Sequence, residues 1–370
     1  MQPLIPYLNG QKQPDTLLIK GILAALTPIG RIHHLIHTLR AQGYRRGILP
    51  AYDPPCPVVS VGNLTSGGTG KTPTALWIAR HLMAQGWRVA VISRGYRQQS
   101  QAPVNVIAHD GQIHITPPQA ADEAFLLAHL LPGATILTGP KRRLLIEHAV
   151  NTLQVEIVVM DDGFQHLQVR RHLDLLLLDG HHPFGNGHLL PRGHLREPLS
   201  ALTRCDAILI TRSGEGEQLA DIRGQITQLA PDKPLLTTQH APSRWSRLTE
   251  AGPVPREPPS QTPLHAFCGI GQPNSFFGNL KNLGFTLTAT ESYPDHHPYS
   301  REDIQGLSER AERSGAGGLV CTEKDGVKID PGETKLPVFT LGVELIFQEE
   351  PHWLTHALAH LAKKNKGVTG

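Results

Sequence analysis

The stretch SVGNLTSGGTGKTP, residues Ser60–Pro73, decides the fold. It follows an apolar run and precedes a helical pattern, which is the context that a phosphate-binding P-loop requires. Three glycines let the backbone curl so that its N–H groups point at phosphate oxygens: Gly67, Gly68 and Gly70. In such a loop Lys71 reaches the β- and γ-phosphates of a nucleotide, and the Thr72 hydroxyl binds Mg²⁺. The stretch therefore predicts a nucleotide-binding α/β core.

One position departs from the general P-loop pattern G-x-x-x-x-G-K-[ST], because its first glycine falls on Thr65. The remainder of the pattern is intact. The predicted phosphate-binding residues are Thr65, Ser66, Gly67, Gly68, Thr69, Gly70, Lys71 and Thr72.

Short apolar runs alternate with helical stretches after this loop, which predicts a P-loop NTPase-like α/β core with a largely parallel sheet. Its predicted strands are Val58–Val61, Val89–Ser93, Ala134–Leu137, Val155–Met160, Leu173–Leu178 and Ala207–Thr211. Pro73–Gln85 is a predicted helix, since its apolar residues recur at helical spacing. Strands of a smaller C-terminal α/β lobe are predicted at Leu264–Gly269, Gly318–Thr322 and Val338–Leu341.

The composition is that of a globular protein with two or three domains. The chain has 370 residues, against about 150 for an average domain. Hydrophobic residues make up 39% and charged residues 18%, which excludes wholesale disorder, collagen and a polytopic membrane protein. The net charge of +3 is too mild to indicate a nucleic-acid partner. The four cysteines form no C-x-x-C pair, so we expect neither a zinc site nor a disulfide framework, and a reducing compartment fits.

The expected domain boundaries follow from charge and proline content. Residues 1–50 carry six Lys and Arg side chains against one Asp, a basic amphipathic arm. Residues 51–240 form the P-loop core. Residues 241–263 contain six prolines and little periodicity, which predicts a linker. Residues 264–370 are the smaller lobe.

Within the basic arm, Leu17–Arg40 reads as an amphipathic helix, since Ile32, Leu35, Ile36 and Leu39 recur at helical spacing. Polar residues interrupt its apolar run before the ~20 residues that a membrane span needs. No basic n-region or cleavage site flanks it, so we do not expect a signal peptide. Two interpretations remain: a helix packed on the core, or an interfacial anchor with cations at anionic headgroups.

A second chemical signal is VEIVVMDDGFQH, residues Val155–His166. An apolar strand that ends in acids is how a P-loop enzyme presents its second magnesium ligand. Asp161 and Asp162 are both candidates for that ligand, and the pair could divide the work between metal and a bound water.

Several other stretches carry candidate groups. Arg94 in SRGYR could clamp an anion, and Asp122 with Glu123 opens an apolar helix, where acids also stabilise the helix end. The long cationic loop Gly185–Pro198 is of a kind that is often functional. YPDHHPY could supply a single proton-transfer histidine. TEKD, residues 322–325, lacks the spacing of the guanine-reading motif N-K-x-D, which favours ATP over GTP.

Taken together, the ordered motifs resemble the tetraacyldisaccharide 4′-kinase family, the lipid A pathway kinases of Gram-negative bacteria. The matching stretches are VGNLTSGGTGKTP, SRGYR, the helix start at Asp122, TGPKR, MDDGFQH, GNGHLLPRGHLREP, CGIGQP, YPDHHPYS and TEKD. The threonine at position 65, in place of the first P-loop glycine, is also usual in this family. His194 stands where the family usually has proline, and Ala121 where it has glycine.

The resemblance implies transfer of the γ-phosphoryl group of ATP to the 4′-hydroxyl of a tetraacyldisaccharide 1-phosphate, which forms lipid IVA. It implies Asp122 as base with His296 bonded to it, Lys71 at the phosphates, and Mg²⁺ held by Thr72 with Asp161 or Asp162. It further implies acceptor-binding roles for Arg94, Tyr96, Glu123, Arg142, Gln165, His166, Arg196 and Glu197.

The same resemblance implies a peripheral enzyme at the cytoplasmic face of the inner membrane, attached through the N-terminal helix. Its partners are then the glycolipid and the membrane surface, with no nucleic acid and no obligate protein partner. Two other functions stay open: a soluble P-loop kinase of a small metabolite, and a membrane-associated nucleotide switch.

Overall fold

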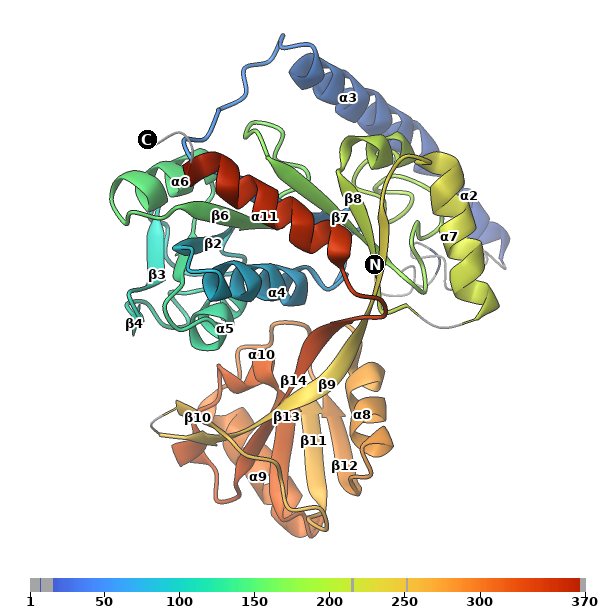
Figure 1. Cartoon of the computed structure of the whole chain (residues 1–370). Coiled ribbons are helices and arrows are strands. Elements are labelled where there is room, and N and C mark those ends of the chain that lie inside the picture. Colours follow the sequence, from blue (N-terminus) through green and yellow to red (C-terminus); the bar gives the residue numbers. More distant parts are fainter. Residues whose placement is uncertain (1–6, 8–15, 214–215, 251, 367–370) are drawn as a thin grey trace.

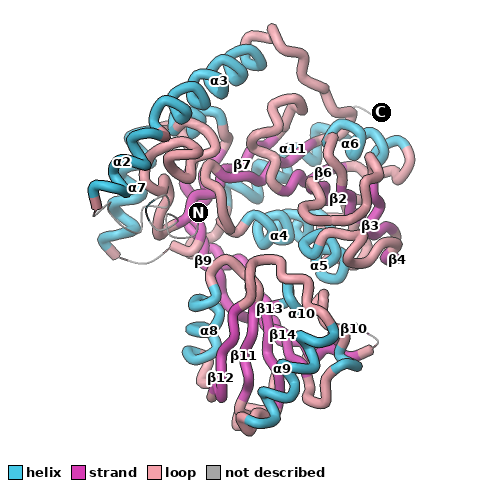
Figure 2. The backbone as a smooth tube through the Cα atoms, turned by 180° about the vertical axis from the view of Figure 1, so that it is seen from behind, coloured by secondary structure: helices cyan, strands magenta, loops and turns pink. Residues whose placement is uncertain are grey.

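Two lobes are stacked one above the other in the computed structural model, which describes residues 7, 16–213, 216–250 and 252–366 (Figures 1 and 2). Strands of both lobes join one twisted sheet in the order β12-β11-β13-β14-β9-β8-β7-β1-β6-β2-β5-β3-β4. The P-loop lobe holds the strands from β9 to β4, and the smaller lobe holds those from β12 to β14 together with most of β9.

The sheet of the P-loop lobe is parallel from β9 to β5 and antiparallel at its far edge, where β3 and β4 lie. Its strands are β1 (Val58–Asn63), β2 (Val89–Ser93), β3 (Asn105–His109), β4 (Gln112–Ile113), β5 (Thr135–Thr138), β6 (Ile157–Asp161), β7 (Leu173–Asp179) and β8 (Ala207–Thr211). The six strands predicted for this core are confirmed. The edge strands β3 and β4 were not predicted.

Helices cover both faces of this sheet, because its central strands are apolar on both sides. The core against one face contains residues of α4 (Lys71–Ala84), α5 (Asp122–Leu130) and α11 (His352–Lys366). The cores against the other face contain residues of α6 (Arg142–Asn151), the 3₁₀ turn η2 (Leu199–Arg204) and α7 (Glu217–Leu229).

The smaller lobe is a sheet between two helices. Its strands are β11 (Leu264–Cys268), β12 (Leu287–Ser292), β13 (Gly318–Thr322) and β14 (Val338–Phe347). Phe276 and Leu280 of α8 (Pro273–Asn282) pack on one face, while Ile304 and Leu307 of α9 (Arg301–Arg313) pack on the other. Short helical turns α10 (Glu323–Gly326) and η3 (Pro331–Glu333) precede β14. The three strands predicted here are confirmed, and β12 was not predicted.

The predicted linker, residues 241–263, is largely strand over its first part, whereas residues 256–263 form neither helix nor strand. β9 (Leu235–Thr249) runs from the first lobe into the second, and β10 (Gly252–Pro255) pairs with it. The first residues of β9 pair in parallel with β8, and the following residues of β9 pair antiparallel with β14. Pro242 is tolerated because it lies opposite Val343, at a register shift in this ribbon. The lobes are thus joined by two paired strands (Figure 1).

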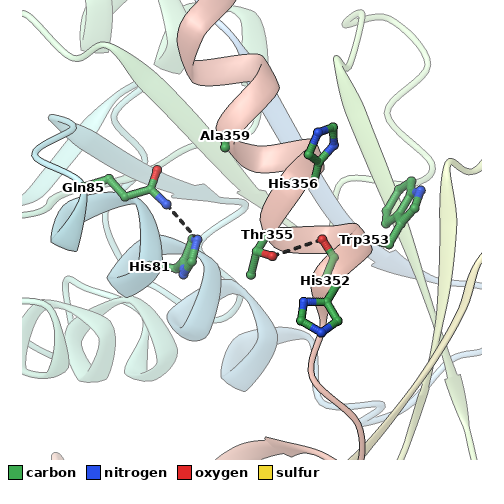
Figure 3. Close-up of a pocket in the computed structure, with 7 residues that line it drawn as sticks. All are labelled: His81, Gln85, His352, Trp353, Thr355, His356 and Ala359. Atoms are coloured by element: carbon green, nitrogen blue, oxygen red, sulfur yellow. Dashed lines mark hydrogen bonds between the residues drawn. The ribbon is translucent and has the colours of Figure 1, made fainter.

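The C-terminal boundary also differs from expectation, since α11 packs on the first lobe. Leu354 and Leu358 are fully buried in the core beside α4. A hollow of about 750 Å³ lies where α11 meets α4. Figure 3 shows the residues that line it: His81, Gln85, His352, Trp353, Thr355, His356 and Ala359. This lining includes no predicted site residue.

The described residues 16–50 of the N-terminal arm form two helices where one was predicted. α2 (Leu17–Ala25) ends and α3 (Thr27–Arg45) begins around Leu26, because Pro28 in the first turn of α3 cannot donate the hydrogen bond that a continuous helix needs. The apolar stripe of α3 is exposed: Ile29, Ile32, Leu35, Ile36 and Leu39 are 52–61% accessible. No helix among the described residues has the length and apolar character of a membrane span.

Candidate active site

The P-loop lies where β1 ends and α4 begins. Gly70, the N-cap of α4, has a φ of 80° and no side chain caps the helix. The first N–H groups of α4 are therefore left for a ligand, and the helix dipole favours an anion there. A side chain at position 70 would clash, since a Cβ would lie 2.5 Å from Nε2 of His240 on β9. The start of α4 thus leaves its first N–H groups free for the predicted phosphate site.

Thr72 and Asp161 meet at the end of β6. The Thr72 hydroxyl donates to Oδ2 of Asp161 at 3.1 Å. The other oxygen of this carboxylate, Oδ1, is buried without a hydrogen-bond partner among the described residues. Burial is the main cause that raises the pKa of Asp161 to about 7, with the charge of Glu123 adding to it. A buried carboxylate with one unpaired oxygen beside a P-loop threonine has the chemistry of a cation ligand.

Unlike Asp161, Asp162 has both carboxylate oxygens in hydrogen bonds. Both of its oxygens accept from the Arg196 guanidinium, at 2.8 and 3.2 Å, and Lys71 lies 3.7 Å from Oδ1. Burial raises the pKa of Asp162, but the charges of Lys71 and Arg196 outweigh it and hold that pKa below its ordinary value. Arg196 also donates to the Asn63 side chain at 3.2 Å. Asp162 therefore ties the cationic loop to the P-loop.

Asp122, the predicted general base, and His296, its predicted partner, come together across the lobe boundary. Asp122 is the first residue of α5 in the P-loop lobe, and His296 lies between β12 and α9 in the other lobe. Nδ1 of His296 is 3.3 Å from Oδ2 of Asp122, although 174 residues separate them. Burial raises the pKa of Asp122, but the hydrogen bond from His296 and the charge of Lys328 more than offset it, so the pKa lies below its ordinary value.

Lys324 orients this histidine. Its Nζ lies 3.0 Å from Nε2 of His296, 3.3 Å from Asp295 and 3.4 Å from Glu123. A lysine ammonium can only donate, so Nε2 accepts and the ring proton sits on Nδ1, facing Asp122. The contacts fix the tautomer that presents a donor to the carboxylate.

Lys328 adds a second cation behind the same carboxylate. Its Nζ lies 3.7 Å from Asp122 and 3.0 Å from the fully buried Asp325. Asp325 in turn accepts from the Gly269 N–H and the Thr322 hydroxyl. Lys324 of the TEKD stretch and Lys328 just after it therefore place two cations at the lobe boundary. Neither lysine was predicted to have a role, because no local pattern shows that they meet Asp122 and His296.

Two of the predicted acceptor-binding residues lie near the aspartate pair, Arg142 buried and His166 half-buried. Arg142 is 3% exposed, donates to the Gly139 carbonyl at 2.9 Å and has an unpaired Nε. Burial lowers its pKa to about 10, while the charges of Asp162 and Asp161 oppose this shift. Burial, with Arg142 next, lowers the pKa of His166 to about 4, so this imidazole is neutral at pH 7. Cationic and neutral donors thus stand together beside the acids.

Other predicted residues occupy different settings. The Tyr96 ring is 5.4 Å from that of His296, whereas Arg94 is exposed. Gln165 donates to the Asn63 carbonyl at 2.9 Å. Glu197 is 2% exposed and both its oxygens bond to Arg204, so in this structure it is one half of a buried ion pair. Their contacts with an acceptor stay predictions.

Arg97 is a further lobe contact that the sequence did not single out. Its Nη1 donates to the Asp295 carbonyl at 2.7 Å, so a hydrogen bond joins the SRGYR loop to the loop that carries His296. The neighbouring Arg94 received the prediction instead, because nothing in the sequence shows which of the two arginines faces the second lobe.

Comparisons with known proteins identify the family of the chain. A family model described as "Tetraacyldisaccharide-1-P 4′-kinase" matches residues 22–362. The tetraacyldisaccharide 4′-kinase of Desulfotalea psychrophila is 38% identical over 85% of this chain and 90% of its own. That of Syntrophotalea carbinolica is 41% identical over 91% of this chain and 92% of its own.

A solved structure extends the agreement to the fold. The crystal structure of LpxK from Aquifex aeolicus in complex with ATP matches with a TM-score of 0.74 and 28% identity, covering 92% of this chain and 99% of that one. The mostly parallel α/β core is shared. The chain therefore belongs to the tetraacyldisaccharide-1-P 4′-kinase family, and it is a kinase.

Proposed function

We propose that this chain transfers the γ-phosphoryl group of ATP to the 4′-hydroxyl of a tetraacyldisaccharide 1-phosphate, with lipid IVA as the product. The observation that carries the proposal is the Asp122–His296 pair, in which a carboxylate of the P-loop lobe meets a histidine of the smaller lobe across the lobe boundary. A nucleotide switch needs no base for a sugar hydroxyl. The family membership of the chain names the acceptor class.

ATP binds, in this proposal, with its phosphates on the free N–H groups of α4 and on Lys71. Mg²⁺ fits beside them, since the unpaired Oδ1 of Asp161 and the Thr72 hydroxyl offer hard oxygen ligands. Among the described residues no three or more His, Cys, Asp or Glu side chains form a metal cluster, so phosphate oxygens and water would complete the coordination. When bound there, Mg²⁺ would supply positive charge against the β- and γ-phosphates. Asp161 is thus the proposed ligand, and Asp162 positions Lys71 and Arg196.

Asp122 removes the proton from the attacking 4′-hydroxyl. As the 4′-oxygen forms its bond to the γ-phosphorus, the bond from that phosphorus to the β,γ-bridging oxygen breaks and ADP leaves. The Nδ1–H of His296 holds the carboxylate in place, and Lys324 holds His296 in the required tautomer. Positioned proton transfer of this kind contributes about 10²–10⁴-fold. Arg142 and Arg196 supply positive charge near the transferred group.

The membrane is the second proposed partner, at the cytoplasmic face of the bacterial inner membrane. The exposed aliphatic stripe of α3 and the basic character of the arm support an interfacial anchor over a helix packed entirely on the core. The polar side of the same helix touches the site region, since Arg40 donates to the Gln165 carbonyl at 3.4 Å. An anchor placed there would hold the site at the depth of a lipid headgroup.

The test uses purified protein, ATP, Mg²⁺ and tetraacyldisaccharide 1-phosphate in detergent micelles, with the lipid product analysed by mass spectrometry and ³¹P NMR. The expected product carries one added phosphate, on the 4′-oxygen. Phosphorylation of a short, water-soluble acceptor with equal efficiency would favour the small-metabolite kinase. Hydrolysis of ATP with no phosphorylated lipid would favour the switch.

A further inference from the structure

A hollow of about 640 Å³ lies between α3 and the loop that leads from β7 to η2. Both α2 and α3 run along the outside of the first lobe (Figures 1 and 2). The hollow is lined by Thr27, Gly30, Arg31, His34, Gly187, His188, Leu189, Arg192, Leu195, Pro198, Leu199 and Ser200. None of these residues belongs to the P-loop, the aspartate pair or the Asp122–His296 pair.

The residues that line this hollow carry positive charge and no negative charge. The lining contains Arg31 and Arg192 and no Asp or Glu. Arg192 donates to the Thr27 hydroxyl at 3.0 Å, and Asn186 fixes its backbone by donating to the Arg192 carbonyl at 3.0 Å. Within the described part of the chain, neither guanidinium forms an ion pair with a carboxylate. Burial lowers the pKa of His188, and the charge of Arg192 adds to this, so the two arginines carry the charge.

The remaining lining is aliphatic and adjoins an exposed aliphatic surface. Leu189, Leu195, Leu199 and Pro198 contribute the apolar wall. α3, which forms the other wall, exposes Ile32 and Leu35 at 61% and 57%. A ligand with an anionic head and hydrocarbon chains matches both features, because its head meets the arginines while its chains lie along α3.

We propose that this hollow binds the phosphate headgroup of an anionic phospholipid of the bilayer, as a site distinct from that of the glycolipid acceptor. The separation follows from the loop itself. Leu195 faces the hollow, whereas the next residue, Arg196, is held by Asp162 and Asn63 at the P-loop. The proposal rests on the proposed membrane association and would fix the orientation of the enzyme on the surface, since a headgroup in the hollow places α3 flat on the bilayer.

The experiment measures sedimentation of the full chain with acceptor-free vesicles, made either of phosphatidylcholine alone or of phosphatidylcholine mixed with phosphatidylglycerol. The pocket variant is Arg31→Gln with Arg192→Gln. Its control is Arg45→Gln with Arg46→Gln, which removes the same charge from exposed positions at the end of α3. Circular dichroism and thermal unfolding verify that both variants fold.

Wild type is expected to prefer the phosphatidylglycerol vesicles, and the pocket variant to bind them at least about tenfold more weakly than the control variant does. Equal losses in the two variants would show diffuse attraction and overturn the site. The vesicles hold no glycolipid acceptor, so any binding measured is to bilayer lipids. If the pocket variant bound phosphatidylglycerol vesicles as tightly as wild type, the proposal that the hollow binds a phospholipid headgroup would be overturned.

Arg31→Gln alone against Arg45→Gln alone repeats the comparison without breaking the Arg192–Thr27 bond, should the double variant unfold. Failure of wild type to bind either vesicle would refute the membrane association on which this site rests. Because no ATP is present, that result is separate from any failure of phosphoryl transfer.

Discussion

Replacing Asp122 with asparagine tests the proposed base with minimal change of shape. The amide keeps an oxygen that accepts from Nδ1 of His296, 3.3 Å away in the wild type, but it cannot take the proton of a hydroxyl. We therefore expect kcat to fall about 10²–10⁴-fold, which corresponds to roughly 3–5 kcal/mol of transition-state stabilisation. The KM for ATP should change little, because no described contact joins Asp122 to the P-loop.

The same change has a predictable effect on stability. Since the folded-state pKa of Asp122 is lowered, its carboxylate stabilises the fold above the ordinary pKa of 3.8, and this contribution is lost as the pH falls through the folded-state value. At neutral pH the variant should lose about 1 kcal/mol, the scale of an acid at a helix N-terminus. Denaturant unfolding at neutral and acidic pH measures this, and the difference from wild type should shrink in acid.

Glu123→Gln is the matched control, because it removes the neighbouring carboxylate of α5, which is 3.4 Å from Lys324 and 44% exposed. Its kcat should stay within about tenfold of wild type. The assay is initial-rate phosphorylation of the lipid acceptor in micelles, with both substrates varied. An Asp122→Asn enzyme with near-normal kcat and a raised KM for ATP would refute the reasoning and make Asp122 a binding or helix-end residue.

Three further changes probe other contacts. Lys324→Met should lower kcat and alter its pH profile, since Nε2 of His296 loses its donor, and Lys324→Arg should restore part of both; an unaltered profile contradicts the positioning role. Arg196→Lys should lower kcat/KM about tenfold or more, because lysine cannot make the paired bonds to Asp162; steady-state kinetics with normal values would exclude this tie. Leu354→Ala should cost about 2–5 kcal/mol in denaturant unfolding, and a loss below about 1 kcal/mol would place α11 outside the core.

The parallel core could be predicted because its strands are buried on both faces and therefore read as continuous apolar runs, as in Ile157–Met160. The edge pair β3 and β4 lacks this signal, since Gln112 and Ile113 are exposed. The second part of β9 was mistaken for a linker because Pro242 argues against a strand, and only pairing with β14 overrides that local preference. The return of α11 to the first lobe depends on tertiary packing that periodicity does not encode.

The site residues likewise fall into those that local sequence predicts and those that depend on tertiary contacts. Lys71 and Thr72 follow from local spacing, because a P-loop is contiguous in sequence. The pairing of Asp122 with His296 came only from the family resemblance, since 174 residues separate them. The roles of Lys324, Lys328 and Arg97 depend on how the lobes meet, which no local pattern specifies. The choice between Asp161 and Asp162 likewise needed the observation that Arg196 occupies the second.

Transfer of labelled γ-phosphate from ATP to tetraacyldisaccharide 1-phosphate, by wild type and by Lys71→Ala, tests the central claim most directly. Nucleotide binding and thermal unfolding are measured on the same samples, because Lys71 contacts the Gly67 carbonyl and Asp162 rather than the core, and its loss should leave the fold intact. The account predicts labelled lipid with wild type and almost none with the variant. Near-normal transfer by Lys71→Ala would contradict the phosphate site, and ATP binding by wild type without labelled lipid would contradict the lipid kinase itself.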